Sequence, residues 1–277
     1  MEIKIGHLII LFLGVLIGLA ATWGLARMRT KRLTISVAQR ALDILEVEKI
    51  MSKHKHIGGG AWDNTKELET IWVDPDGPHS KTATLGSPSG IWEGMELIMR
   101  YYGTAHRDSQ RKELEAFNKL YPDIKVVPEN YGIGTWYGGN NPTNPVIEIA
   151  GDGKTAKGLW DSNGPMITSS VRDGKVVAQG AWFWRMYAVD FVKEGGEWKI
   201  WHMNIVYDII PPLEAEYGLD WTKYRVPERR GGGDSSDPLG PTRPNPNPYE
   251  EWSPLRLPQH QPRIPEPYYT FSETFSY

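Results

Sequence analysis

Hydrophobic residues recur at helical spacing along the first part of the chain. Residues 34–53 contain neither glycine nor proline, and they carry an apolar stripe made of Ala38, Ala41, Leu42 and Leu45. This spacing predicts an amphipathic helix. Consecutive glycines at positions 58–60 make further helix costly, so we expect the helix to end before them.

Two more helices are predicted downstream. Asn64 followed by Glu67 resembles a capping box, and apolar residues at 68, 71 and 72 continue it as a short helix. Residues 75–86 are rich in proline and glycine and predict a loop. Residues 91–121 again place apolar side chains at helical spacing, which predicts a long helix that ends at the following proline.

The second half of the chain changes to a pattern typical of strands. Residues 181–208 are dominated by β-branched and aromatic residues in two arms, and Gly195-Gly196 between them suits a tight turn with positive φ. In the first arm one face carries Trp182, Trp184, Met186 and Ala188, and the other carries Phe183, Arg185, Tyr187, Val189 and Phe191. Because both faces are largely apolar, we expect one to pack on helices and the other to line an enclosed pocket.

Further strands precede this hairpin. Residues 146–149 and 155–160 predict a first hairpin around Gly151 to Gly153, and Asp173-Gly174 marks the turn into the long one. Helices therefore come first and an antiparallel sheet second, which predicts the α+β class.

The uncharged run Leu8–Leu25 predicts a transmembrane helix, because at about 1.5 Å per residue it spans roughly 27 Å. Arg27, Arg29, Lys31 and Arg32 follow it at once, and the positive-inside rule then places the next domain in the cytoplasm. The alternative is a cleaved signal peptide with a small-residue site before Ala21, which would export the domain.

The end of the chain differs from its middle. More than half of its twenty-one prolines lie in 227–277, so this stretch predicts an extended tail. It is also rich in aromatic residues, and we expect it to wrap over its own domain or a partner subunit of a homo-oligomer. The predicted organisation is a membrane anchor at 1–32, an α+β domain at 33–226 and the tail at 227–277.

Composition narrows the function classes. The formal net charge of −3 and the lack of a basic cluster in the domain argue against nucleic-acid binding. There is no cysteine, which excludes thiolate nucleophiles and Cys-ligated zinc. Neither a glycine-rich phosphate loop nor a zinc motif occurs, so the sequence predicts no cofactor and no metal site.

The order of these elements resembles the SnoaL-like branch of the nuclear transport factor 2-like superfamily. The resemblance runs from about Ala38 to Asp208, rests most on PVIEIAGDGKTAKGLW and DFVKEGGEWKI, and extends to the ending IPEPYYTFSETFSY. It implies a curved antiparallel sheet and three helices that form a cone-shaped pocket. Relatives include scytalone dehydratase, ketosteroid isomerase and bile-acid dehydratase, whereas other members only bind a ligand.

The catalytic residues of the dehydratases do not carry over. Where the resemblance implies a Tyr and an Asp at the end of the first helix, this chain has His56 and then Gly60-Ala61. Where it implies two histidines, this chain has Trp136 and Trp160. An indole N–H donates a hydrogen bond but takes no proton, so a copied dehydratase mechanism is not expected.

Three titratable residues remain as catalytic candidates. His202 shares a strand face with Asn204, and a neutral imidazole beside an amide suits proton transfer near neutral pH. The alternative for His202 is a ring satisfied by a neighbour. His56 and the nearby His54 are placed near the pocket mouth, or on a solvated helix end. Asp161 is a candidate base, although alternation points it away from Trp160.

Aromatic residues supply the predicted substrate-binding set, which is Tyr101, Trp136, Trp160, Trp184 and Tyr187 together with Asn204. Such rings fit a hydrophobic cyclic small molecule. The sequence therefore predicts a membrane-anchored α+β domain with an aromatic pocket, acting as a cofactor-independent dehydratase-like lyase or isomerase. A non-catalytic module that binds a small molecule or a protein is the alternative.

Overall fold

A computed structural model describes residues 34–58, 64–124, 126, 132–134, 136–138, 141–209, 237–246, 257 and 262–277. The chain divides into two units, Met1–Ile35 and Ser36–Tyr277, and all helices and strands described below belong to the second. Within the described ranges no helix combines the length and the apolar character needed to cross a bilayer. The predicted membrane segment Leu8–Leu25 lies outside them.

Helices dominate the first half, as predicted. They are α2 (Val37–Gly58), α3 (Thr65–Ile71), α4 (Met95–Ile98), the π-helix η2 (Met99–Ala105) and α5 (His106–Leu120), with short 3₁₀ turns at Ser80–Thr82 and Phe271–Glu273. The predicted long helix thus begins at Met95 rather than at residue 91. Gly103 lies in the π-helical turn, where a Cβ would be 3.3 Å from Thr65 Oγ1.

The buried face of α2 differs from the predicted one. The stripe of Ala38, Ala41, Leu42 and Leu45 is exposed, and the helix instead buries Asp43, Val47, Ile50, Met51 and His54. Both sets have helical spacing. The set that is buried has the larger side chains and finds polar partners on the sheet. The spacing of residues along the helix does not show which set these partners will select.

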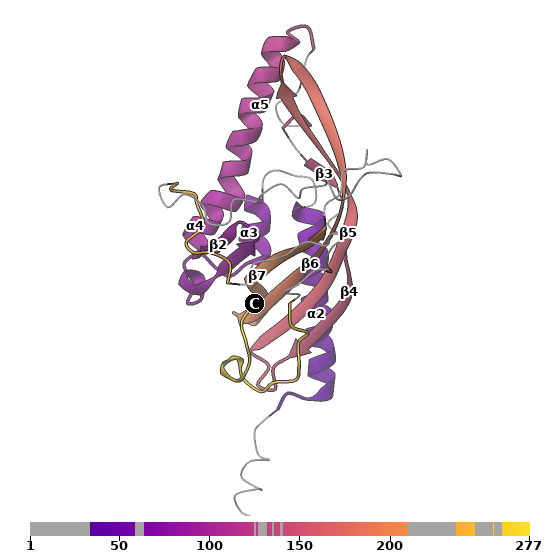
Figure 1. Cartoon of the computed structure of the whole chain (residues 1–277). Coiled ribbons are helices and arrows are strands. Elements are labelled where there is room, and N and C mark those ends of the chain that lie inside the picture. The colour runs from indigo at the N-terminus through magenta and orange to yellow at the C-terminus, as the bar shows by residue number, and fades with distance from the viewer. Residues whose placement is uncertain are drawn as a thin grey trace, which may run out of the picture. The chain divides into compact units, whose positions relative to one another are not determined.

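Seven strands form one sheet. They are β1 (Thr84–Ser87), β2 (Gly90–Glu93), β3 (Trp136–Gly138), β4 (Pro142–Ile149), β5 (Thr155–Arg172), β6 (Lys175–Glu194) and β7 (Glu197–Ile209). The order is β2-β1-β7-β6-β5-β3, and β4 also pairs with β5. Figure 1 shows the strong curvature of the long strands.

The expectation of a wholly antiparallel sheet was wrong at one edge. β1 runs parallel to β7, so the sheet is mixed, and the β1–β2 hairpin occupies part of the stretch predicted as loop and helix. Parallel neighbours need a long crossover. The helices and strands between β1 and β7 in the chain supply that connection.

The turns predicted at Asp173-Gly174 and Gly195-Gly196 are both present, whereas β5 and β6 extend beyond the predicted residues 155–160 and the predicted start at 181. The turn between β6 and β7 has Gly195 and Gly196 at φ values of 59° and 88°, and the turn between β5 and β6 has Asp173 and Gly174 at 49° and 71°. Two central residues with positive φ match the right-handed twist of the strands that they join.

The two faces of the sheet have different covers. Register places Trp160 opposite Tyr187 and Ser162 opposite Arg185, so these four share one face. His54 of α2 contacts Tyr187, and we call this the helix face. Lys157 lies opposite Asp190, and Asp190 lies opposite His202, on the other face.

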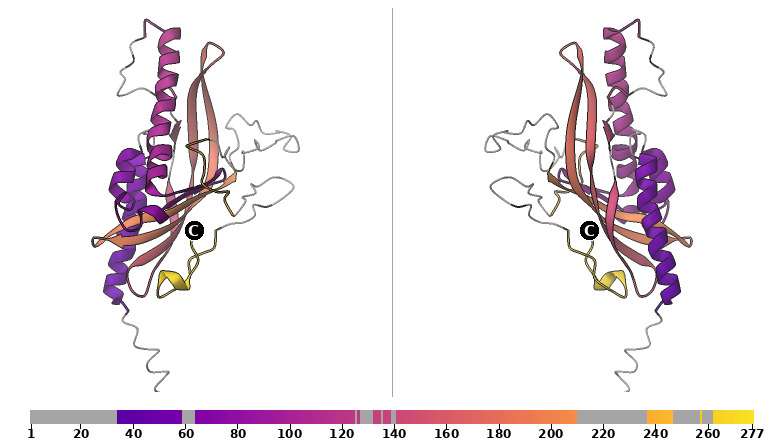
Figure 2. Two further views of the ribbon diagram at one scale, coloured as in Figure 1. Left: turned by 90° about the vertical axis from the view of Figure 1, so that its left-hand side faces the viewer. Right: turned by 90° about the vertical axis from the view of Figure 1, so that its right-hand side faces the viewer.

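Residues 262–277 cover that second face, and we call this segment the strap. It joins the sheet through main-chain bonds from Gly151 N to Tyr268 O at 2.9 Å and from Asp152 N to Tyr269 O at 3.1 Å. Figure 2 shows the strap in yellow on the side of the sheet away from α2. The sheet therefore separates two buried environments.

Candidate functional site

A histidine–carboxylate pair lies beneath the helix face. His54 Nδ1 is 2.9 Å from Glu67 Oε1, and the two side chains are 1 % and 0 % exposed. α2 positions the histidine through its buried face, and α3 positions the glutamate. The indole N–H of Trp72, the residue after α3, donates to the same oxygen at 3.2 Å. Buried polar groups without such partners are costly.

The pairing sets the chemistry of the imidazole. If Glu67 is ionised it can only accept hydrogen bonds, and the contact then requires the proton to be on His54 Nδ1. In the neutral ring the lone pair then lies on Nε2, the atom that a general base uses. His54 Nε2 is buried and has no hydrogen-bond partner within the part of the chain that the structure describes.

A buried cation lies in the same cluster. Arg185 is 6 % exposed, and its guanidinium carbon is 4.9 Å from the ring centre of Tyr187, whose own ring is 5.0 Å from that of His54. Burial acts to lower the pKa of Arg185, but the hydroxyls of Tyr187 and Tyr207 outweigh it and the pKa rises. The side chain therefore stays charged.

The tyrosines beside these groups remain protonated. Burial, with a smaller contribution from Glu67, raises the pKa of Tyr102 well above its ordinary value. Burial likewise raises the pKa of Tyr187 to about 12, although Arg185 opposes it. Tyr102 comes from the π-helix η2. This conformation is rare in proteins overall, but where it occurs it is often at a functional site. The cluster thus combines a base, a fixed positive charge and phenolic donors.

A second polar cluster lies under the strap. Asp190 Oδ1 accepts from Lys157 Nζ at 2.6 Å, and Asp190 Oδ2 accepts from His202 Nδ1 at 2.8 Å. Asp190 and Lys157 are fully buried. Burial lowers the pKa of Lys157 even though Asp190 opposes the shift, so the cost of desolvation exceeds the gain from the pair.

The strap completes this second cluster. Ser276 Oγ and the backbone N–H of Tyr277 both donate to Asp190 Oδ2, at 3.1 and 3.0 Å. The Lys157 ammonium is surrounded by the rings of Phe271, Phe275 and Tyr277 at 4.4 to 4.9 Å. Both oxygens of the Asp190 carboxylate therefore have hydrogen-bond partners within the protein.

The predicted site residues do not form one pocket. His202 and Asn204 lie on the strap face, whereas Trp160 and Tyr187 lie on the helix face. His202 is satisfied by Asp190 and by the carbonyl oxygen of Thr82, 3.1 Å from Nε2. Asn204 Oδ1 accepts from Asn245 at 3.2 Å. Both side chains are thus hydrogen-bonded to other groups of the protein. Alternation along β7 points them away from the helices.

The other candidates are dispersed. His56 is exposed at the end of α2, and Asp161 accepts a hydrogen bond from Asn144 near the surface of β4 and β5. Trp184 is 39 % exposed beside Trp182. Tyr101 stacks on Trp92 with ring centres 3.9 Å apart. Trp136 lies on β3, and its side chain is outside the described part.

Sequence reasoning missed His54, Glu67 and Arg185 as a group. His54 follows Val47, Ile50 and Met51 at helical spacing, and this pattern, rather than that of the alanines, identifies the buried face. Arg185 stands alone among aromatic residues in the middle of a strand, where a charge is unusual. Both signals were present, but their partners come from distant elements.

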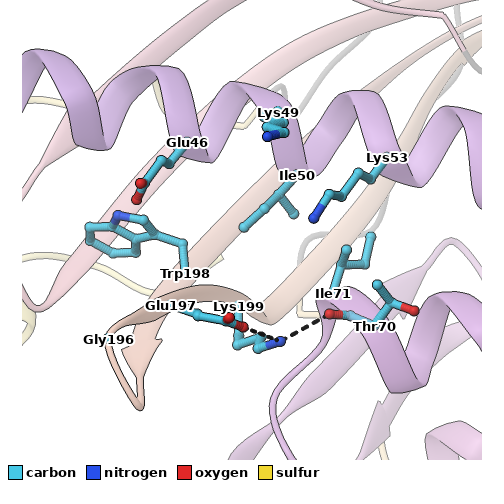
Figure 3. Close-up of a pocket in the computed structure, with 10 residues that line it drawn as sticks. All are labelled: Glu46, Lys49, Ile50, Lys53, Thr70, Ile71, Gly196, Glu197, Trp198 and Lys199. Carbon is cyan, nitrogen blue, oxygen red and sulfur yellow. Dashed lines mark hydrogen bonds and ion pairs between the residues drawn. The ribbon is translucent and has the colours of Figure 1, made fainter.

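An open groove lies elsewhere on the unit, between α2, α3 and the β6–β7 turn. Its volume is about 270 Å³, and Figure 3 shows Lys49, Lys53 and Lys199 around it with Trp198 on one wall. Lys199 is held by the carbonyl of Thr70 and by Glu197. Among the described residues, none with a buried polar atom that lacks a hydrogen-bond partner lines this groove. The described residues also contain no group of three or more His, Asp or Glu side chains suited to a metal ion.

Comparison with known proteins gives similarities only among solved structures. No family model matches the chain, and no curated protein does. The hexachlorocyclohexane dehydrochlorinase LinA-type3 from Novosphingobium barchaimii LL02 is 15 % identical at a TM-score of 0.38, covering 65 % of this chain and 95 % of its own. A type 2 LinA dehydrochlorinase is 15 % identical at 0.39, covering 70 % and 99 %.

A third solved structure is an NTF2-like protein with a cystatin-like fold from Novosphingobium aromaticivorans. It is 11 % identical at a TM-score of 0.32, covering 60 % of this chain and 82 % of its own. All three scores lie below 0.5, so these similarities assign neither a family nor an activity to this chain.

Proposed function

We propose that this protein is a cofactor-independent acid–base lyase or isomerase that acts on a hydrophobic cyclic small molecule. The observation that carries the proposal is the buried His54–Glu67 pair, with an imidazole nitrogen that has no partner among the described residues. Glu67 orients the ring and stabilises the imidazolium that forms when Nε2 takes a proton.

The neighbouring groups have complementary roles in this proposal. His54 Nε2 removes a proton from a carbon next to a ring carbonyl, and negative charge develops on the carbonyl oxygen. The hydroxyl of Tyr187 is a suitable donor to that oxygen, because its raised pKa keeps it protonated. Return of the proton to another carbon gives an isomer, whereas its transfer to a departing hydroxide gives water and an alkene.

Aromatic walls support the choice of substrate class. Trp160, Phe183 and Phe191 are fully buried on the same strand faces as the polar cluster, and Phe183 lies 4.5 Å from the Arg185 guanidinium. Rings of this kind favour flat apolar ligands. The predicted membrane anchor Leu8–Leu25, the cytoplasmic location and the homo-oligomer remain proposals that rest on the sequence.

The test is proton exchange rather than product analysis, since the natural substrate is unidentified. We expect the protein to accelerate deuterium incorporation from D₂O into a bicyclic ketone such as 2-tetralone, measured by NMR against the buffer rate. His54→Gln should reduce the accelerated rate by about two to four orders of magnitude. His56→Gln is the matched control on the same helix, and its rate should equal that of the wild type.

Two results would contradict the proposal. Equal exchange by His54→Gln and wild type would remove the imidazole from the chemistry. Binding of the ketone by calorimetry without any exchange above buffer would favour the alternative function, a module that binds a small molecule without turnover.

A further inference from the structure

The guanidinium of Arg185 lacks a counter-ion on the helix face. No carboxylate within the part of the chain that the structure describes forms an ion pair with it, and its polar neighbours are the hydroxyls of Tyr187 and Tyr207, with which it interacts by hydrogen bonding. Glu67 of the same cluster accepts from His54 and Trp72 through Oε1, and its Oε2 has no hydrogen-bond partner among the described residues. A buried charge without a partner of opposite sign is expensive, so this arrangement suits an anion that comes from outside the chain.

The free atoms of Arg185 define the shape of that anion. Nε and Nη2 are both buried and both without a hydrogen-bond partner among the described residues. These two nitrogens form one edge of the guanidinium, and their N–H bonds point in parallel. A planar pair of oxygens about as far apart as those of a carboxylate accepts both bonds at once.

A third donor lies on the adjacent strand. Ser162 of β5 is in register with Arg185 of β6, so both side chains leave the sheet on the same face. The Ser162 hydroxyl is fully buried and also has no partner in the described part of the chain. It can donate to an oxygen held by the arginine.

We propose that the ligand of this site carries a carboxylate, which Arg185 binds through Nε and Nη2 with Ser162 as an auxiliary donor. The inference deepens the proposed function by specifying the substrate as a cyclic carboxylic acid. The anchored carboxylate orients the ring, and the ring presents its reacting carbon to His54. Binding of this anion does not depend on whether the chemistry takes place.

The test compares two ligands that differ only in charge. 2-Naphthoate and 2-naphthamide have nearly the same shape, and calorimetry at pH 7 gives the affinity of each. The wild type should prefer the carboxylate by about ten- to hundredfold, as expected for charge-assisted hydrogen bonds. Arg185→Gln should abolish this preference, and Ser162→Ala should reduce it about two- to tenfold.

Further variants separate binding from folding. Arg185→Lys keeps the charge but loses the two parallel donors, so it should keep only a small part of the preference. Arg111→Gln removes an exposed arginine and should leave the preference unchanged. Circular dichroism identifies any variant that does not fold. If a variant does not fold, the preference of the wild type for 2-naphthoate over 2-naphthamide still tests the inference.

Equal affinity of the wild type for the two ligands would overturn the inference. It would mean that the charge of Arg185 is already neutralised within the protein. Because the readout is affinity, this failure is distinct from a failure of His54 in deuterium exchange.

Discussion

At the scale of single residues, two histidines on one helix show how environment decides chemistry. His54 and His56 are two positions apart on α2, yet His54 is buried against Glu67 and Tyr187 and His56 is exposed. Positions two apart on a helix point about 200° apart, so only one can meet the sheet. A candidate catalytic residue found in a local motif should therefore be checked against the burial pattern of the whole helix or strand that carries it.

The buried ion pair gives a first prediction for stability. Lys157→Met leaves Asp190 charged and buried with one strong donor fewer, and this should lower the free energy of unfolding by about 3–5 kcal/mol. Arg111→Met breaks an exposed pair with Asp108 and should cost at most about 1 kcal/mol. Urea denaturation at pH 7 measures both. Similar costs for the two variants would show that Asp190 is solvated in solution.

At the scale of elements, strand patterns predicted more than helix patterns did. The hairpins of β5, β6 and β7 follow from alternation and from glycines that tolerate positive φ, both of which are local. The buried face of α2 was predicted incorrectly, and β1 and β2 were missed. A helix face is chosen by distant partners such as Glu67, and a four-residue strand is stabilised mostly by its neighbours.

The candidate site was less predictable for the same reason. His202 was chosen because it is titratable and lies on a strand, but the sequence does not say which face of β7 the helices cover. The shared face of Tyr187 and Trp160 follows from the register of β5 and β6, which the sequence does not give. The pairing of His54 with Glu67 joins α2 to α3 and has no signature in the order of residues.

The strap supplies a prediction about an element. A Cβ on Gly151 would lie 2.5 Å from Tyr269 Cδ2 and 3.3 Å from its Cα, so Gly151→Ala should displace the strap from the sheet. We expect a lower melting temperature and faster cleavage near residues 262–277 in limited proteolysis. Gly132→Ala is the control, because no atom of the described residues lies within 4 Å of its added Cβ. A strap as resistant to protease in Gly151→Ala as in the wild type would contradict this packing.

At the scale of the whole molecule, buried tyrosines predict sensitivity to alkali. Burial raises the pKa of Tyr101, Tyr102, Tyr187, Tyr268 and Tyr277. For Tyr187 the folded value is about 12, against an ordinary value of about 10. Between these pH values the unfolded chain releases a proton that the folded chain retains. Stability should thus be independent of this group below pH 10 and fall as pH rises toward 12.

This alkaline transition is directly measurable. Tyr187 alone should reduce the free energy of unfolding by about 2–3 kcal/mol by pH 12. Absorbance of phenolate should rise in two phases, first from exposed tyrosines near pH 10 and then together with the loss of ellipticity. A single phase near pH 10 with the fold intact would contradict the burial of these hydroxyls.

The N-terminal segment predicts where the intact protein is found. The uncharged run Leu8–Leu25 should carry the full chain into the membrane fraction, whereas a chain that starts at Thr34 should stay in the supernatant. Carbonate extraction followed by N-terminal sequencing checks both. Intact chain with Met1 in the supernatant would argue against an anchor, and a chain that starts at Ala21 would establish the signal-peptide alternative.

Strand β6 carries Arg185 on one face and Asp190 on the other, and these two charges affect the register in which β6 pairs with its neighbours. A slip of one residue would turn every side chain of β6 to the other face. Asp190 would then leave Lys157 and lie under the helices, and Arg185 would leave Ser162 and turn to the other face of the sheet. Apolar residues on both faces of β6 penalise such a slip only weakly, so these two charges are what reject a misaligned strand during folding.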